Sequence, residues 1–303
     1  LRRKNSLAGG KMKQSIYTVA ENRCIAPMVY EMTLKGDPSG ILPGQFVNIA
    51  LEGFYLRRPI SVCDLKDDGM VIIYKVVGSG TEKMAAMKSG VKLDVITGLG
   101  NGYDLSPAGK RPVLLGGGAG VPPMYLLAKE LIRGGASVCA VLGFNKKEEI
   151  FYEKEFKDLG CDTFVTTVDG SYGIKGFVTD ALPQQYTYFY ACGPEPMLKA
   201  VYRAAAGSGQ MSFEERMGCG FGACMGCSVK VRGGSKDLFC KGRAWAVFQV
   251  VDITRRQPGQ FLEFILSYLF FLKIADKSLF NSIFHSCKIF LRKICVELLK
   301  IFP

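Results

Sequence analysis

Four cysteines towards the C-terminal end of the chain are spaced as iron–sulfur ligands. Cys219, Cys224 and Cys227 follow the pattern C-x4-C-x2-C, and Cys240 comes after a further twelve residues. Plant-type [2Fe–2S] clusters are held by four thiolates at this spacing. The glycines between these cysteines let the backbone approach the sulfur atoms closely. We therefore predict a one-electron redox centre on these four residues.

A zinc-binding knot is the alternative to an iron–sulfur cluster. Structural zinc sites pair two short C-x2–4-C units, and the second unit is missing here. Scattered single cysteines such as Cys24, Cys63, Cys139 and Cys161 are expected to be small buried hydrophobes. The chain has eleven cysteines, an odd number, and no signal-peptide pattern in residues 1–11. Both features favour a reducing, cytoplasmic compartment over a disulfide-bonded protein.

The chain has a single histidine, His285, near its C-terminus. Histidine is the side chain most often used for acid–base catalysis, so such a mechanism is nearly excluded for the body of the protein. The chemistry is expected to reside on bound cofactors.

Two motifs in the first third of the chain could bind a flavin nucleotide. Residues 58–61, Arg-Pro-Ile-Ser, place a guanidinium beside a hydroxyl, and these groups can meet a phosphate and a ring edge. Residues 75–81, Lys-Val-Val-Gly-Ser-Gly-Thr, form a glycine-rich turn into a predicted helix, which suits a pyrophosphate. An ordinary solvated turn is the alternative for each motif alone, but in this order they reinforce each other.

Two further motifs could bind a pyridine nucleotide. Residues 116–123, Gly-Gly-Gly-Ala-Gly-Val-Pro-Pro, join a predicted strand to a predicted helix, although Val121 stands where a full G-x-G-x-x-G has its third glycine. Residues 192–197, Cys-Gly-Pro-Glu-Pro-Met, follow the last predicted strand of that region, so Cys192 is expected to face the ligand crevice. A buried cysteine before a turn is the alternative. Residues 145–147, Asn-Lys-Lys, could meet a 2′-phosphate or be solvated, so the sequence does not choose between NAD and NADP.

Two kinds of scaffold are needed to position these motifs, and the periodicity of the chain changes accordingly. Residues 12–106 contain short apolar runs between Gly/Pro turns, typical of a small antiparallel barrel, with one helix at 81–89. From 110 to 207, predicted strands at 112–115, 137–142, 163–167 and 186–191 alternate with helices at 122–133 and 148–159. That alternation indicates a parallel α/β sheet, so the chain is predicted to be multidomain.

The order of these motifs resembles the ferredoxin–NADP⁺ reductase superfamily. Within it, the chain is most similar to the electron-transfer subunits of NAD-dependent (class 1B) bacterial dihydroorotate dehydrogenases. Residues 169–173, Asp-Gly-Ser-Tyr-Gly, and 214–224 belong to the same pattern, which covers residues 12–241. The resemblance implies a β-barrel FAD-binding domain at 12–108, an α/β NAD-binding domain at 109–207 and a [2Fe–2S] subdomain at 208–242.

The resemblance also assigns cofactors to residues. It implies FAD on Arg58, Pro59, Ile60, Ser61, Ile73, Tyr74, Lys75, Gly80 and Thr81. It implies NAD⁺ on Gly117, Gly118, Ala119, Gly120, Cys192, Gly193, Pro194 and Met197. It implies the cluster on Cys219, Cys224, Cys227 and Cys240.

A partner follows from the same resemblance: the FMN-containing catalytic subunit that oxidises dihydroorotate, in a heterotetramer with two copies of each subunit. NAD⁺ accepts a hydride and a cluster moves single electrons, whereas FAD exchanges both, so FAD is expected between them. The expected path runs from dihydroorotate through FMN, cluster and FAD to NAD⁺, within pyrimidine biosynthesis. Similar subunits of NADH-dependent ferredoxin:NADP⁺ oxidoreductases and of sulfide dehydrogenases are alternatives. A zinc-stabilised binding module without redox activity is the alternative from another class.

Both ends of the chain depart from the pattern. Residues 1–11 are expected to be a non-native extension before Met12. After Cys240 the family continues Cys-x-Asp-Gly-Pro-Val-Phe, whereas this chain reads Cys-Lys-Gly-Arg-Ala-Trp. We interpret residues 243–303 as an aberrant tail from a reading-frame slip or read-through, which predicts a labile cluster. Its apolar run at 261–272 is shorter than the roughly 20 residues that span a bilayer, so no membrane segment is expected.

The net charge of +12 is concentrated at the same two ends. Residues 1–11 hold four basic and no acidic residues, and residues 243–303 hold nine basic and four acidic ones. A nucleic-acid-binding domain carries its positive charge as a stripe on one face, and no such stripe is present. No nucleic-acid partner is expected.

Overall fold

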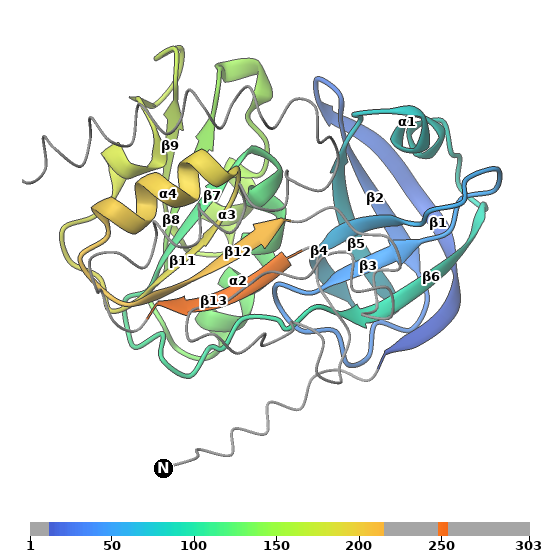
Figure 1. Ribbon diagram of the computed structural model, residues 1–303, viewed down its shortest axis with the longest axis horizontal. Coiled ribbons are helices and arrows are strands. Elements are labelled where there is room, and N and C mark those ends of the chain that lie inside the picture. The colour runs from blue at the N-terminus through green and yellow to red at the C-terminus, as the bar shows by residue number, and fades with distance from the viewer. Residues whose placement is uncertain (1–11, 215–247, 254–303) are drawn as a thin grey trace, which may run out of the picture. The chain divides into compact units, whose positions relative to one another are not determined.

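The computed structural model of the protein describes residues 12–214 and 248–253. Its N-terminal part is a closed antiparallel barrel with the strand order β1-β2-β5-β4-β3-β6 (Figure 1). The strands are β1 (Lys13–Ala26), β2 (Val29–Lys35), β3 (Phe46–Ile49), β4 (Arg58–Lys66), β5 (Gly69–Lys75) and β6 (Lys92–Leu99). Helix α1 (Ser79–Ala85) lies between β5 and β6. It begins two residues before the start of the predicted helix at 81–89 and ends four residues before the end of that prediction.

The barrel is held together by every second residue of its strands. Successive side chains of a strand point to opposite faces, and one set of alternate residues is fully buried in a single apolar cluster. That set includes Tyr17 and Val19 of β1, Met32 and Leu34 of β2, Met70 and Ile72 of β5, and Leu93 and Val95 of β6. The alternation explains why this region is a barrel with a filled interior.

The second part is a seven-stranded sheet in the order β10-β9-β8-β7-β11-β12-β13. Its strands are β7 (Val113–Gly117), β8 (Cys139–Phe144), β9 (Asp162–Thr167), β10 (Ile174–Lys175), β11 (Phe189–Cys192), β12 (Gly209–Glu214) and β13 (Phe248–Ile253). All neighbours are parallel except β12 and β13, which are antiparallel. The helices are α2 (Val121–Arg133), α3 (Glu153–Asp158) and α4 (Glu195–Ala204), with short 3-10 turns at Gly118–Gly120, Lys147–Glu149 and Val178–Ala181.

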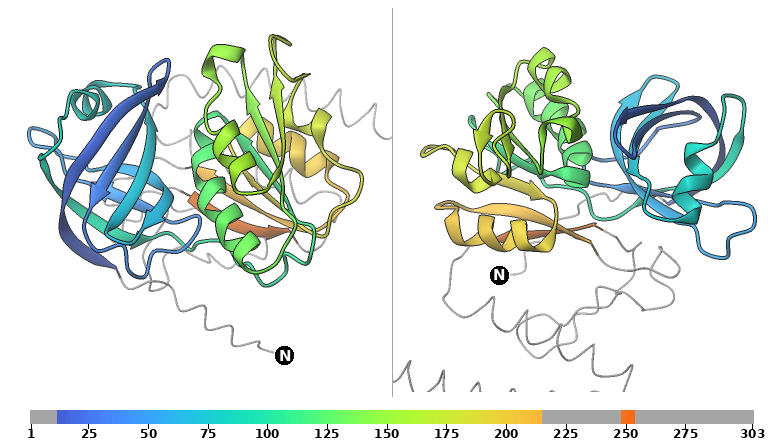
Figure 2. Two further views of the ribbon diagram at one scale, coloured as in Figure 1. Left: turned by 180° about the vertical axis from the view of Figure 1, so that it is seen from behind. Right: turned by 90° about the horizontal axis from the view of Figure 1, so that it is seen from above.

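Helices cover both faces of this sheet, because its central strands are apolar on both sides. Leu114 of β7 is buried in the cluster that contains Leu127 of α2. Its neighbours Val113 and Leu115 are buried in the cluster that contains Leu198 of α4. Figure 2 shows α2 and α4 on opposite sides of the sheet. The predicted fold of an antiparallel barrel followed by a parallel α/β sheet is therefore confirmed.

Three local features differ from the expectation. The predicted helix at 148–159 is broken into the turn Lys147–Glu149 and α3, because Tyr152 takes a left-handed backbone with a φ of 67°. Strand β12 extends the sheet into the range 208–242, and β13 lies inside the range 243–303. The reading-frame slip stays a prediction, but six residues of that range have a place in the sheet.

No helix in residues 12–214 is long and apolar enough to cross a membrane.

Candidate functional site

The ladder between β4 and β5 ends at the residues predicted to hold FAD. Strands β4 and β5 are paired only from Val62 and Ile72 towards the turn between them. Beyond that point, Arg58–Ser61 pairs only with β3, and Ile73–Lys75 pairs only with β2. The two predicted FAD-binding segments therefore face each other across a gap between neighbouring strands, and their backbone groups on that side are not used by the β4–β5 ladder.

The polar groups at this opening fit an anionic, hydrogen-bonding ligand. The Ser61 hydroxyl is buried and has no hydrogen-bond partner among the described residues. Such a group is costly to bury unless something binds it. The Arg58 guanidinium lies over the ring of Phe54, with 4.7 Å between its central carbon and the ring centroid. Phe54 was not predicted as a site residue. The only sequence feature that could have indicated it is its position as an apolar residue next to Tyr55.

The glycine-rich turn brings Arg58 and the start of α1 together. A β-carbon at Gly80 would lie 2.1 Å from the Nε of Arg58, so the guanidinium would have to shift if this residue were not glycine. The Thr81 hydroxyl accepts hydrogen bonds from the Val77 and Gly78 amides at 2.9 and 3.2 Å. Thr81 therefore shapes the turn through its side chain, and a charged group held by Arg58 would lie beside it.

Two of the predicted FAD residues on β5, Ile73 and Tyr74, are buried. The side chains of Ile73 and Tyr74 are 6% and 3% exposed, and the Tyr74 hydroxyl donates to the Asn22 side-chain oxygen at 3.0 Å. Burial raises the pKa of Tyr74 above its usual value. Only the backbone of these two residues is available to a ligand at the opening.

The two predicted nucleotide turns lie at the carboxyl edge of the parallel sheet. Strands β7 and β11 are direct neighbours, with Gly116 opposite Cys192. Helix α2 begins directly after the turn Gly118–Gly120, and α4 begins at Glu195 after Pro194. Both helices carry proline in the first turn, where the missing N–H costs nothing. Two helix N-termini side by side at this edge can accept the phosphates of a dinucleotide.

Glycines let these two turns touch. A β-carbon at Gly120 would lie 2.1 Å from the carbonyl oxygen of Cys192. A β-carbon on Gly117 would lie 2.3 Å from the Met197 sulfur, and one on Gly193 would lie 2.7 Å from the same sulfur. The Met197 thioether thus fills a notch between two glycines and links the turns. Met197 was predicted as a nucleotide-binding residue, and this packing role is an additional one.

The remaining predicted nucleotide residues differ in exposure. Cys192 is completely buried, whereas Ala119 and Pro194 are exposed. The buried thiol agrees with the alternative for Cys192, a cysteine packed before a turn.

Residues 145–147 lie at the same edge of the sheet. The Asn145 side-chain amide donates to Glu149 at 2.9 Å. The Lys147 amide donates to the Ser171 hydroxyl at 2.8 Å, while the Ser171 amide and hydroxyl donate to Asp169. These bonds and a nearby Lys146 lower the pKa of Asp169, the hydrogen bonds from Ser171 most of all. An anionic carboxylate therefore lies near Lys146, one of the two lysines that could meet a 2′-phosphate.

The four predicted cluster ligands, Cys219, Cys224, Cys227 and Cys240, lie outside the described residues. The described strands on either side define where that segment departs and returns. Strand β12 ends at Glu214, which is paired with Phe248 at the start of β13. The chain therefore leaves the sheet and re-enters it at the same point.

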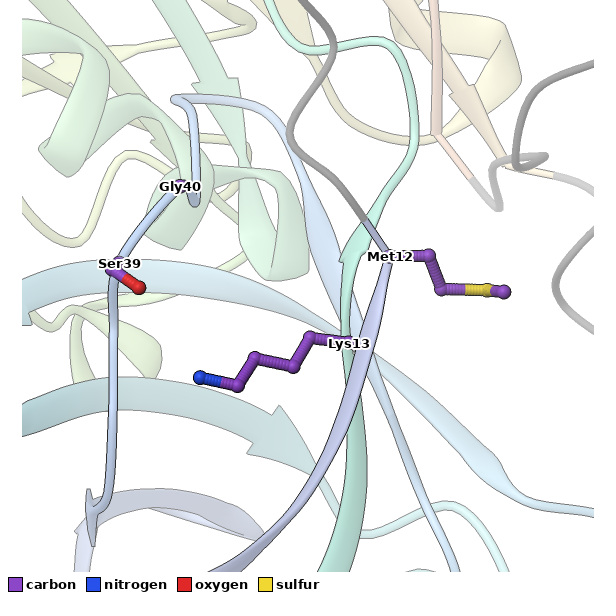
Figure 3. Close-up of a pocket in the computed structure, with 4 residues that line it drawn as sticks. All are labelled: Met12, Lys13, Ser39 and Gly40. Atoms are coloured by element: carbon purple, nitrogen blue, oxygen red, sulfur yellow. The ribbon is translucent and has the colours of Figure 1, made fainter.

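A hollow of about 440 Å³ lies elsewhere on the barrel, lined by Met12, Lys13, Ser39 and Gly40 (Figure 3). Lys13 forms an ion pair with the exposed Asp37, and none of the lining residues belongs to a predicted site. We assign it no role.

Two segments of the chain match known protein families. Residues 114–203 match the oxidoreductase NAD-binding domain. Residues 214–242 match the iron–sulfur cluster binding domain of dihydroorotate dehydrogenase B, and this range contains all four predicted cluster cysteines.

Full-length relatives extend the similarity through the barrel. The chain is 45% identical over 235 residues to the electron transfer subunit of dihydroorotate dehydrogenase B (NAD(+)) of Fusobacterium nucleatum, covering 72% of this chain and 90% of the relative. The corresponding subunit of Geobacillus sp. (strain WCH70) is 42% identical over 256 residues, covering 79% and 99%. The chain belongs to this family. It is therefore a member of the oxidoreductase electron transfer subunits, as the order of motifs predicted.

A solved structure has the same fold. It is that of an NADH-dependent reduced ferredoxin-NADP oxidoreductase studied for flavin-based electron bifurcation, with a TM-score of 0.70 and 28% identity. The match covers 86% of this chain and 99% of that one. Phthalate dioxygenase reductase, at 20% identity and a TM-score of 0.53, shares the fold.

Proposed function

We propose that this chain passes electrons from a dihydroorotate-oxidising catalytic subunit to NAD⁺. The observation that carries the proposal is the placement of two ligand-ready features on one chain of this family. One is the gap in the barrel between Arg58–Ser61 and Ile73–Lys75, and the other is the pair of glycine turns at the carboxyl edge of the sheet. The first fits FAD and the second fits NAD⁺.

Each group of residues has a separate task in this proposal. Arg58 would neutralise a phosphate, and the buried Ser61 hydroxyl would hydrogen-bond the flavin. The turns at 117–120 and 192–197 would hold the nucleotide through backbone N–H groups. Cys219, Cys224, Cys227 and Cys240 would bind the cluster as thiolates. When bound, these cofactors supply the exchange between hydride and single electrons, which no side chain of the protein can perform.

The partner is part of the proposal. The names of the relatives describe one subunit of a larger enzyme, so a catalytic subunit must supply the electrons. We propose that this subunit contains FMN, that the complex has two copies of each subunit and that it works in the cytoplasm. Because electron transfer needs short distances between cofactors, the segment with the four cysteines is proposed to lie at the subunit interface.

Co-expression with the catalytic subunit tests this function. The purified complex should contain FAD and iron, and it should form NADH from NAD⁺ when dihydroorotate is added. Cys224→Ser should abolish this activity and lower the iron content. Cys139→Ser, which changes a half-buried cysteine of β8 instead, should leave both unchanged. A colourless, zinc-containing protein would contradict the proposal.

A second function is favoured by one observation, the TM-score of 0.70 to the NADH-dependent reduced ferredoxin-NADP oxidoreductase. In that case the partner would be a large iron–sulfur flavoprotein. Reduced ferredoxin, instead of dihydroorotate, would then support nucleotide reduction by the complex. Assaying both donors with each partner decides between the two functions.

A further inference from the structure

Tyr152 has a backbone conformation that its side chain disfavours. Its φ of 67° lies in the left-handed region, which is rare for a bulky residue. The position starts α3, and a glycine would adopt this backbone at no steric cost. Backbone strain of this kind persists only where the surroundings impose it. The contacts of the Tyr152 side chain must therefore offset the strain.

Those contacts cross from the α/β sheet to the barrel. The Tyr152 hydroxyl donates to Oε2 of Glu31, on barrel strand β2, at 2.7 Å. The other oxygen of Glu31 pairs with Arg23 of β1 at 2.7 Å. The buried thiol of Cys63, on β4, is near enough to influence the Tyr152 hydroxyl electrostatically. Strand β2 thus contacts Tyr152 directly through Glu31, and β1 supports this contact through the pairing of Arg23 with Glu31.

The hydrogen bond between Tyr152 and Glu31 is buried, and the Tyr152 hydroxyl remains its donor. Tyr152 is 9% exposed and Glu31 is 8% exposed. Burial, the nearby Cys63 and Glu31 raise the pKa of Tyr152 far above its usual value, so the phenol stays protonated and remains the donor. A hydrogen bond to a charged acceptor in a buried site is among the stronger ones in proteins.

Aromatic packing fixes the same residue from the other side. The Tyr152 ring meets Tyr125 of α2 edge-to-face, with 5.0 Å between centroids, and it also meets Phe151. Tyr125 in turn meets Phe156 of α3. Because α2 begins at the nucleotide turn, a movement of Tyr152 would be transmitted to the helix that carries this turn.

We propose that the Tyr152–Glu31 hydrogen bond is a positioning contact, which holds the nucleotide-binding sheet at the distance from the FAD-binding barrel that electron exchange between the two cofactors requires. The inference rests on the proposed function. Tyr152 is not among the predicted cofactor residues, and Glu31 meets them only through the backbone ladder, where it is paired with Ile73. The side-chain bond between Tyr152 and Glu31 therefore acts through the relative placement of the two parts. A misplacement of about 1 Å costs roughly 100-fold in rate, so a partial loosening should have a smaller but measurable effect.

Stopped-flow reduction of the bound FAD by NADH in the complete complex tests the contact. Tyr152→Phe removes only the hydroxyl. It should lower the limiting reduction rate by about tenfold, within the range that small misplacements produce, and leave the NADH concentration for half-maximal rate nearly unchanged. The long-wavelength absorbance of the stacked nicotinamide–flavin pair should weaken in parallel.

The second residue provides a rescue and a coupling test. Glu31→Gln keeps an oxygen that accepts from Tyr152 and should reduce FAD at close to the wild-type rate. Glu31→Ala should be as slow as Tyr152→Phe, and the double variant Glu31→Ala/Tyr152→Phe should be no slower than either.

Tyr17→Phe is the matched control. It removes another buried tyrosine hydroxyl, whose hydrogen bond to the Asp37 carbonyl stays within the barrel. It should leave the reduction rate and the long-wavelength absorbance unchanged. Equal slowing in Tyr17→Phe, or a wild-type rate and absorbance in Tyr152→Phe, would overturn the inference. Failure of NADH to reduce the wild-type flavin would instead refute the proposed function.

Discussion

Individual atoms decide whether the nucleotide site can form. A β-carbon on Gly120 would lie only 2.1 Å from the carbonyl oxygen of Cys192. The requirement for glycine comes from this approach of β11, because Gly120 has a φ of −84° that any residue could adopt. A glycine-rich motif read from sequence indicates close approach, but it does not say what approaches.

Gly120→Ala should therefore destabilise the protein by about 1–3 kcal/mol, the usual cost of overpacking, and weaken NADH binding. Urea unfolding and NADH titration measure the two effects. Gly134→Ala is the control, because Gly134 has a φ of −77° and its nearest atom would lie at 3.3 Å. It should change stability by less than about 1 kcal/mol. Equal effects of the two substitutions would show that the close approach is unimportant.

Asp94 gives the barrel a defined acid sensitivity. Its carboxylate receives Arg57 at 2.8 Å and Gln14 at 2.8 Å. The hydrogen bond from Arg57, followed by that from Gln14, lowers the pKa of Asp94 in the folded protein. A lowered folded pKa contributes stability that is present above the unfolded value, about 3.9, and is lost as the pH falls through the folded value.

Wild type should thus be more stable than Asp94→Asn at pH 6, and the difference should shrink below about pH 4. Urea midpoints measured from pH 7 to pH 2.5 would show it. A difference that stays constant down to pH 2.5 would mean that the charge of Asp94 is not the cause.

At the scale of elements, the divergence of β4 and β5 is what makes a flavin site out of a barrel. The two strands pair between Val62–Lys66 and Gly69–Ile72, and they are not paired at residues 58–61 of β4 and 73–75 of β5. The sequence predicted both strands and both motifs, but not the gap, because strand pairing depends on partners distant in the chain. The same limit applies to α3: its apolar pattern continues through 148–159, whereas contacts of Tyr152 with the barrel break the helix.

The gap predicts a specific effect of Ser61→Ala. FAD affinity should fall roughly threefold to tenfold, as expected for one lost hydrogen bond. The FAD-free protein should be as stable as wild type or more so, because a buried hydroxyl without a partner among the described residues is removed. Thr166→Val removes a comparable buried hydroxyl from β9 and should not alter FAD affinity. Fluorescence titration with FAD and thermal unfolding provide both measurements.

At the scale of the molecule, the connection between barrel and sheet is held from both sides. The buried Gln45 of the barrel donates to the Gly100 carbonyl at 2.9 Å. Gln210 of β12 accepts from the Asp104 amide and donates to the Asp104 carbonyl, both at 2.9 Å. Domain composition and order could be predicted from sequence, since each motif is local. The two glutamine hydrogen bonds could not be predicted, because their partners are far apart in the chain. The separation is 55 positions for Gln45 and Gly100 and 106 positions for Gln210 and Asp104.

Gln210→Leu should destabilise the protein by about 1–3 kcal/mol, because it leaves the half-buried Asp104 amide without its partner, whereas the Asp104 carbonyl keeps the hydrogen bond from the Tyr190 hydroxyl. Gln184→Leu, which alters an exposed glutamine, should cost less than about 0.5 kcal/mol. Urea unfolding distinguishes the two. If Gln210→Leu unfolds at the wild-type midpoint, water replaces the glutamine and the connection is not clamped.

The notch filled by Met197 has a consequence for a protein that handles electrons near oxygen. Flavins and iron–sulfur centres can leak electrons to oxygen, and the peroxide formed converts methionine to its sulfoxide, which is polar and bulkier. Met197 is half-buried, and the space around its sulfur would not admit even a β-carbon on Gly117 or Gly193. An added oxygen atom would therefore push the two nucleotide turns apart. We therefore expect oxidation of Met197 to weaken nucleotide binding and methionine sulfoxide reductase to restore it.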